Sequence, residues 1–300
     1  MRSRPGFGDA HVGAIDQFPG GASNITCRVS LEGVPSRDVV LRLQRDRGIF
    51  EPYDVLREGE VLRRLRGSPV PVPAVLASEP DRAGLGAPFL LLEYVDAPHM
   101  GEAGPEADFG AFTRMVATIH GLDWRGLGLE VLGVPGTTAE GIRGELEAVA
   151  RRMPGFGCDG DPLLSRALAS LRRATPADGQ LALCQGDINV FNYLFRKREV
   201  VAVVDWEQAR IGDPRSDIGQ LVALSHLKGA PFVPVQQMPF VQAYQAAAGR
   251  ALSGMEYFRA LWLFELGVIY EGWVAFNGTQ PWYSRAELDV LLESALAELA

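Results

Sequence analysis

Two short apolar runs near residue 200 constrain the fold of this 300-residue chain more than any other feature. Residues 192–195 and 200–204 are rich in aromatic or β-branched side chains, and four charged residues, 196–199, separate them. This pattern predicts a β-hairpin with a polar turn. Because a hairpin returns the chain to its start, Asp205 would lie beside Asn192.

Asp187, Asn192 and Asp205 would then converge, and together they suit the transfer of a phosphoryl group. A carboxylate at position 187 can orient and deprotonate an attacking hydroxyl. The Asn192 amide oxygen and the Asp205 carboxylate are hard ligands for Mg²⁺, which takes a few protein oxygens together with phosphates and water. Each residue alone has an ordinary explanation as a turn or N-cap residue. The joint spacing favours the catalytic interpretation.

The hydrophobic pattern predicts a small β-rich part followed by a larger helical part. The first part alternates short apolar runs with turn signals and contains one helical pattern, at 53–66. The second part is mainly helical, with a cluster of strands at 181–205. Its helices are expected near residues 108–121, 139–153, 161–174, 216–228, 236–249, 255–276 and 285–299.

From Gly20 to about Phe276 the chain resembles the aminoglycoside phosphotransferase and choline kinase-like family, the small-molecule branch of the protein-kinase-like fold. Three blocks carry the resemblance: residues 20–26, 186–192 and 205–217. The first and third blocks, together with residues 86–95, are most similar to the branch that also occurs fused to acyl-CoA dehydrogenases.

The resemblance implies an α+β, two-lobed protein-kinase-like fold. Residues 1–95 would form an N-terminal nucleotide-binding lobe, and residues 96–300 a C-terminal catalytic and acceptor-binding helical lobe. The phosphate donor would be ATP, or GTP in its place, and the metal Mg²⁺. The implied enzyme is a kinase that phosphorylates a hydroxyl of a small molecule, such as a metabolite, a hydroxyacyl compound or an aminoglycoside-like antibiotic.

Candidate nucleotide contacts lie in the N-terminal part. Gly20 and Gly21 could let the backbone approach phosphates, and the small polar side chains of Ser23 and Asn24 could donate hydrogen bonds to them. A Gly-Gly hairpin turn is the alternative. The resemblance assigns the purine contacts to three hinge residues, Glu93, Tyr94 and Val95.

Arg42 stands where the family has a phosphate-binding lysine. Glu58 matches the family's helix glutamate that pairs with this cation, and Glu60 is a second candidate. Arginine is a planar, fixed cation and is not equivalent to lysine, so the geometry of the phosphate contact is left open. The only lysines of the chain are Lys197 and Lys228, which shows that arginine replaces lysine almost everywhere.

The catalytic loop departs from the family pattern at Gln185, where most members carry histidine. A glutamine amide could support the loop through similar donor and acceptor contacts. Asp217 resembles the family aspartate that anchors this loop from the start of a helix. Glu207 could reach the metal, but a cap or a surface ion pair also explains it. Glu265 and Glu271 are weak candidates for acceptor contacts, because a carboxylate in an apolar helix must be paired, exposed or functional.

Composition excludes several other classes. The net charge of −8 argues against a nucleic-acid partner, because such binding rests on clustered Lys and Arg. The three cysteines show no disulfide or zinc-binding pattern, so a reducing cytoplasmic compartment is expected. The four histidines show no metal-binding spacing, so they are expected to be packing or surface residues. The N-terminus lacks an apolar leader, and four charges interrupt the apolar stretch 255–276, so no membrane association is expected. The oligomeric state is left open.

A nucleotide-binding regulatory pseudokinase without phosphotransfer is the alternative function. Arg42 and Gln185 support it, because both depart from the family pattern. The intact set of Asp187, Asn192 and Asp205 argues against it.

Overall fold

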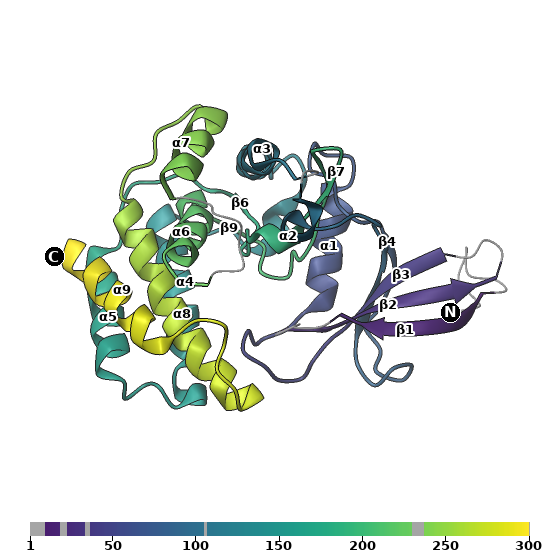
Figure 1. Cartoon of the computed structure of the whole chain (residues 1–300), viewed down its shortest axis with the longest axis horizontal. Helices are drawn as coiled ribbons and strands as arrows, with labels where there is room; N and C mark the ends of the chain where they lie inside the picture. Colours follow the sequence, from purple (N-terminus) through teal and green to yellow (C-terminus); the bar gives the residue numbers. More distant parts are fainter. Residues whose placement is uncertain (1–9, 19–22, 34–36, 105–106, 230–236, 300) are drawn as a thin grey trace. The chain divides into compact units, whose positions relative to one another are not determined.

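The structure is a computed structural model that describes residues 10–18, 23–33, 37–104, 107–229 and 237–299. The chain divides into two compact units, Met1–Asp96 and Ala97–Ala300. The first contains an antiparallel sheet and the second is mainly helical, which confirms the predicted α+β class (Figure 1). The predicted lobe boundary lies one residue before this division. The functions assigned to the two lobes stay predictions.

A five-stranded antiparallel sheet forms most of the first unit, with the strand order β1-β2-β3-β5-β4. Its strands are β1 (His11–Gln17), β2 (Ile25–Glu32), β3 (Arg37–Leu43), β4 (Val75–Glu79) and β5 (Phe89–Glu93). Alternate residues of the inner strands bury an apolar face around Val29, Val39 and Leu91. The sheet therefore has one core face.

Helix α1 (Val55–Leu65) packs against β4 and β5 of the same unit. It begins where the Asp54 carboxylate accepts hydrogen bonds from two N–H groups of the first turn, both at 3.0 Å. Its apolar residues recur at helical spacing, and three of them, Val55, Val61 and Leu65, are buried. This helix was expected at 53–66, and the structure confirms it.

The second unit contains the helices that periodicity predicted. They are α3 (Phe109–His120), α4 (Thr138–Arg152), α5 (Pro162–Ala174), α6 (Pro214–Ser225), α7 (Gln237–Ala248), α8 (Met255–Asn277) and α9 (Arg285–Glu298), and a four-residue helix, α2 (Met100–Ala103), precedes them. Helix α6 begins two residues earlier than expected, because Asp213 caps it and Pro214 fits its first turn.

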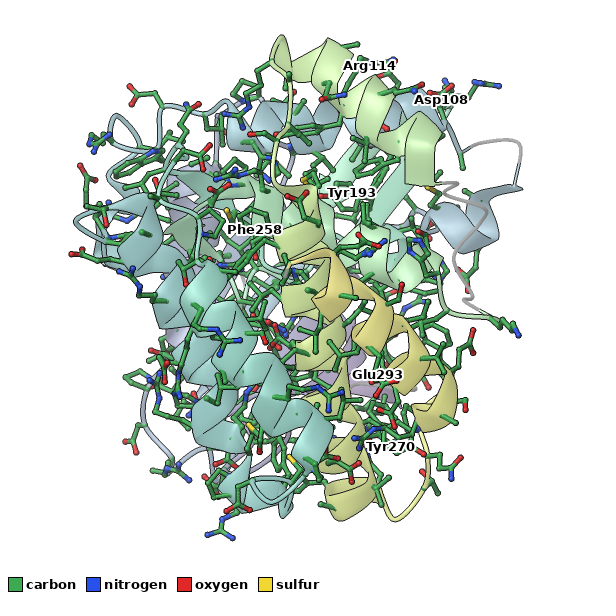
Figure 2. All side chains as sticks on the ribbon, turned by 90° about the vertical axis from the view of Figure 1, so that its left-hand side faces the viewer. Asp108, Arg114, Tyr193, Phe258, Tyr270 and Glu293 are labelled. Carbon is green, nitrogen blue, oxygen red and sulfur yellow. The ribbon has the colours of Figure 1, made fainter. Side chains whose placement is uncertain are left out.

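Helix α8 lies at the centre of the core of this unit. It packs against α5, α6 and α9 (Figure 1). Phe258 and Tyr270 lie on α8, with Glu293 on the neighbouring α9 (Figure 2). Within the described parts of the chain, no helix is both long and apolar enough to cross a membrane.

Two small antiparallel pairs of strands in the second unit flank the loop that contains Asp187. Strands β7 (Tyr193–Arg196) and β8 (Glu199–Val203) form the predicted hairpin, which the structure confirms. Strands β6 (Ala182–Cys184) and β9 (Arg210–Gly212) pair with each other. The chain between β6 and β7 is thus held at both ends.

Candidate active site

The loop after β6 makes a tight turn that only glycine accommodates at position 186. Gly186 has φ of +87°, and a Cβ there would lie 2.4 Å from the carbonyl oxygen of Gln208. A short 3₁₀ turn, Val190–Asn192, then leads into β7. Asp187 therefore lies on the loop that connects β6 to β7.

Three side-chain amides hold the Asp187 carboxylate. Asn189 Nδ2 and Asn192 Nδ2 both donate to Asp187 Oδ2, at 2.7 and 2.9 Å. Gln220 Nε2, from α6, donates to Asp187 Oδ1 at 2.7 Å. These bonds restrict both the position and the rotation of the carboxylate.

Asp205 lies near this carboxylate, as the predicted hairpin requires. The N–H of Val204 donates to the carbonyl oxygen of Asn192 at 2.9 Å, so the end of β8 lies beside the start of β7. Burial raises the pKa of Asp187, and the negative charge of Asp205 raises it further, while the amide donors oppose both effects. The structure thus brings Asp187, Asn192 and Asp205 together.

Asn192 and Asp205 could hold a divalent cation. The Asn192 amide nitrogen faces Asp187, donating also to its main-chain oxygen at 2.9 Å, so the amide oxygen points another way. Asp205 has φ of +62°, an uncommon backbone conformation for a residue other than glycine and one that is often found at functional sites. Two oxygen ligands beside a second carboxylate form a donor set that fits Mg²⁺. The ligand roles stay predictions.

Asp217 holds the loop from α6. Its carboxylate accepts the N–H of Gln185 at 2.8 Å and that of Gly186 at 3.3 Å. Burial alone would raise the pKa of Asp217, but the hydrogen bond from His120 and the charge of Arg210 lower it. Asp217 is therefore an ionised anchor for the backbone before Asp187.

Gln185 makes both kinds of contact that its amide permits. Its Nε2 donates to the carbonyl oxygen of Val204 at 2.9 Å, and its Oε1 accepts the hydroxyl of Tyr193 at 2.7 Å. The side chain is fully buried. Tyr193 lies at the start of β7 (Figure 2). Gln185 therefore connects the loop before Asp187 to the start of β7 and to Val204, the residue that follows β8.

The sequence did not reveal the partners that surround Asp217. His120 is a buried packing residue whose ring nitrogens contact Asp217 at 3.2 Å and the Tyr244 hydroxyl at 2.8 Å. Arg210 contacts Asp217 at 3.5 Å and Glu145 at 2.9 Å. His120 lies 97 residues before Asp217, and Arg210 lies seven residues before it on a separate strand, so no helical or strand spacing indicates either contact.

His120, Cys184 and Asp217 lie close enough together to suggest a metal cluster among the described residues. Burial raises the pKa of the Cys184 thiol well above its usual value. Asp217 already faces two N–H groups and the Arg210 guanidinium. A cation beside this guanidinium would be repelled, so the cluster is a hydrogen-bonded core.

Gln220 was also missed. It lies one helical turn after Asp217, and its Oε1 accepts the N–H of Ile188 at 2.8 Å while its Nε2 binds Asp187. The i, i+3 spacing from Asp217 is the signal that could have identified it, because such residues share a helix face.

The first unit contains the predicted ion pair on β3 and α1. Arg42 Nε lies 3.0 Å from Glu58 Oε2, and both side chains are buried. Glu60, the second candidate, pairs instead with Arg64 at 2.7 Å on the surface of α1. Glu58 is therefore the partner of Arg42.

The remaining nucleotide candidates are only partly described. Gly20 and Gly21 lie outside the described residues. Ser23 and Asn24 are buried, and Asn24 Oδ1 accepts the N–H of Arg45 at 3.3 Å. The oxygen of Asn24 thus supports the end of β3, while the predicted phosphate contacts stay untested.

The three hinge residues begin at Glu93, the last residue of β5. The N–H of Glu93 donates to the carbonyl oxygen of Ala74 at 2.9 Å, so this donor already has a partner within the unit. The Arg28 guanidinium lies 4.6 Å from the centre of the Tyr94 ring. The predicted purine contacts of Glu93, Tyr94 and Val95 stay predictions.

Glu265 and Glu271, the weak acceptor candidates, both pair with arginines. Glu265 lies 2.7 Å from Arg152, and Glu271 pairs with Arg285. These ion pairs explain why an apolar helix can contain the two carboxylates. They provide a structural reason for both residues, and their contact with an acceptor stays a prediction.

Comparison with known proteins places this geometry in a family. Residues 14–261 match the phosphotransferase enzyme family. Mouse acyl-CoA dehydrogenase family member 10 is 28% identical over 214 residues, which cover 67% of this chain and 19% of that protein. Rat acyl-CoA dehydrogenase family member 11 is 25% identical over 296 residues, covering 89% of this chain and 37% of that protein. The chain thus spans well under half the length of these relatives.

Solved structures share the fold. A candidate aminoglycoside phosphotransferase from Ralstonia eutropha superimposes with a TM-score of 0.70 at 23% identity, covering 98% of this chain and 92% of that one. A choline/ethanolamine kinase family protein from Mesorhizobium loti superimposes with a TM-score of 0.63 at 17% identity. The match covers 99% of this chain and 91% of that one. The third structure is a thermostable mutant of aminoglycoside phosphotransferase APH(4)-Ia in complex with AMP-PNP and hygromycin B. It superimposes with a TM-score of 0.67 at 14% identity, and the match covers 96% of this chain and 94% of that one. The match over residues 14–261 shows that this chain belongs to the phosphotransferase enzyme family.

Proposed function

We propose that the protein is a Mg²⁺-dependent kinase that transfers the γ-phosphoryl group of ATP to a hydroxyl of a small molecule. The observation that carries the proposal is the position of the Asp187 carboxylate. Three side-chain amides, including that of Asn192, hold this carboxylate near Asp205. A carboxylate that is fixed in this way can accept a hydrogen bond from an attacking hydroxyl and orient its oxygen.

The reaction would proceed by in-line attack. The acceptor oxygen forms a bond to the γ-phosphorus, the bond from this phosphorus to the β–γ bridging oxygen breaks, and ADP leaves. The hydroxyl proton passes to Asp187, whose raised pKa makes it a stronger base than an exposed aspartate. Bound through Asn192 Oδ1 and Asp205, Mg²⁺ would neutralise the phosphate oxygens.

The first unit supplies a cation suited to the nucleotide. Arg42 is held by the buried Glu58 carboxylate, and a guanidinium presents several N–H donors to phosphate oxygens. The structure of the APH(4)-Ia mutant contains AMP-PNP, an ATP analogue, and this supports ATP as the donor in a shared fold.

The acceptor is proposed only as a class. The curated relatives are named for acyl-CoA dehydrogenation, which favours hydroxylated acids and hydroxyacyl thioesters as the first compounds to test. The structural relatives add aminoglycosides and amino alcohols to the compounds to be tested.

A cytoplasmic location is part of the proposal. The three cysteines, which are buried and form no disulfide, are compatible with it.

The test is a screen of purified protein with Mg·ATP against a panel of hydroxyacyl compounds, amino alcohols and aminoglycosides. ADP release and phosphorylated product should both appear with at least one alcohol and should require Mg²⁺. The Asp187→Asn variant is the control, and its turnover should be lower by about a thousandfold or more, because an amide cannot take the proton. Its affinity for Mg·ATP should stay within a few-fold, since the side chain faces the hydroxyl.

Two outcomes would contradict the proposal. A parent protein that binds Mg·ATP but phosphorylates no alcohol would be a nucleotide-binding pseudokinase. An Asp187→Asn variant that loses ATP binding without a separate catalytic defect would reject the role assigned to Asp187.

A further inference from the structure

Helix α6 holds the catalytic loop on both sides of Asp187. Asp217 accepts the N–H groups of Gln185 and Gly186, and Gln220 accepts the N–H of Ile188 at 2.8 Å. Gln220 also reaches the Asp187 carboxylate itself, through Nε2 at 2.7 Å. One side chain thus binds both the reactive group and the backbone that follows it.

The hydrogen bonds divide unequally between the two oxygens of Asp187. A carboxylate oxygen has about two lone-pair sites. Oδ2 receives donors from Asn189 and Asn192, at 2.7 and 2.9 Å, which occupy both. Among the described residues, Oδ1 receives only the donor from Gln220. Oδ1 therefore keeps one site for a further donor.

We propose that Gln220 is a positioning residue, which fixes the Asp187 carboxylate so that Oδ1 accepts the hydrogen bond of the acceptor hydroxyl. This inference rests on the proposed function, because it names the oxygen that would face the substrate. Gln220 is 6% exposed, so its amide is held by these two contacts with little competition from water. Without it, Oδ1 loses its only donor among the described residues, and only the two amides on Oδ2 then oppose rotation of the carboxylate about its bond to Cβ.

Two substitutions separate positioning of the carboxylate from support of the backbone. Gln220→Leu removes both contacts. Gln220→Glu keeps an acceptor for the Ile188 N–H but replaces the donor to Asp187 by an oxygen that repels it. Gln245→Leu is the matched control, because it removes a helix amide of the same unit whose side chain, among the described residues, accepts the N–H of Leu252 and makes no contact with Asp187.

The activity experiment uses the full chain with Mg·ATP, both with water as acceptor and with an alcohol identified by the screen. Gln220→Leu and Gln220→Glu should each lower kcat by about tenfold to a hundredfold while KM for ATP changes less than about threefold. Gln245→Leu should keep both constants. A Gln220→Glu variant with the parent's kcat would overturn the inference, because backbone support would then be the whole role.

A stability experiment tests the contact without any substrate. Urea unfolding of the parent, Gln220→Leu, Asp187→Ala and the double variant forms a double-mutant cycle. The loss of stability caused by Gln220→Leu should fall to about half or less when Asp187 is already alanine. Additive losses would overturn the inference.

The two experiments also separate this inference from the proposed function. A parent that turns over neither water nor any alcohol rejects the proposed function, and coupling in the cycle would then identify a purely structural contact. A parent that is active, with Gln220 variants of unchanged kcat, rejects the inference alone.

Discussion

Gln185 holds the loop before Asp187 through two hydrogen bonds, a partly buried one to the Val204 carbonyl and a buried one from the Tyr193 hydroxyl. A neutral histidine offers the same pair, one donor and one acceptor. The departure from the family pattern at this position thus preserves the contacts that a histidine could make. It gives little support to a disabled enzyme.

We expect Gln185→His to keep phosphoryl transfer within about tenfold of the parent, a difference of ~1.4 kcal/mol in activation free energy. Gln185→Leu should instead lower the free energy of unfolding by about 2 to 4 kcal/mol, because it leaves a buried hydroxyl and a partly buried carbonyl without this partner. Steady-state kinetics and urea unfolding measure the two effects. If the parent is inactive and Gln185→His restores turnover, the chain is a disabled kinase.

Arg42 is the second departure, and its buried pairing with Glu58 shows that arginine fits this position. Arg42→Ala should lower kcat/KM for ATP by about a hundredfold, and Arg42→Lys should recover only part of it, since a point charge replaces a planar fork. Glu60→Gln is the control, because Glu60 pairs with Arg64 on the surface of the same helix. Equal kcat/KM in all four proteins would remove Arg42 from the nucleotide site.

At the scale of elements, periodicity and capping located the long helices and the hairpin. The helix expected near 139–153 is Thr138–Arg152, because Thr137 and Glu140 form a capping box at its start. Strand β6 lies within the strand cluster expected at 181–205, but β9 and its pairing with β6 were not predicted, because three-residue strands carry no measurable alternation.

The candidate site was predictable only where it is local. Asp187, Asn192 and Asp205 lie on one loop and one hairpin, so their spacing indicated their convergence. The contacts of Asp217 with His120 and Arg210 depend on how α3, β9 and α6 pack. That packing involves residues up to 97 positions apart, which no local pattern records.

Helix α6 also makes a prediction about pH. The pKa of Asp217 is lowered in the folded state, so its ionised form adds stability above its unfolded pKa, and this stability is lost as pH falls through the folded pKa. Asp217→Asn should therefore be clearly less stable than the parent at pH 7. The difference should narrow between about pH 5 and pH 2.

Urea unfolding at a series of pH values measures this difference. The neighbouring groups are His120, Arg210, Glu145 and Cys184, and they are the same in both proteins. A stability difference that is constant from pH 7 to pH 3 would show that the charge of Asp217 is not what anchors the loop.

At the scale of the whole molecule, the residues proposed to contact the nucleotide belong to one unit, and the proposed base and metal ligands belong to the other. Arg42 and Glu58 belong to Met1–Asp96, whereas Asp187 and Asp205 belong to Ala97–Ala300. A ligand that binds the native protein and not the unfolded chain stabilises all that unfolds with its site. Thermal unfolding in the presence of ATP therefore detects nucleotide binding without requiring turnover.

ATP should raise the Tm by several degrees more with Mg²⁺ than with EDTA, because the metal bridges the phosphates to the protein and so lowers the Kd for ATP. A ligand at a hundred times its Kd adds about 2.7 kcal/mol of stability. Asp205→Ala should abolish the difference between the two conditions, since it removes a carboxylate that lies beside Asp187. Glu207→Gln is the control, because Glu207 lies two residues away and was the competing metal ligand, so its variant should keep the parent's Mg²⁺ effect. If Asp205→Ala keeps the full Mg²⁺ effect and Glu207→Gln loses it, the metal ligand is Glu207 and the predicted pairing of Asn192 with Asp205 is wrong.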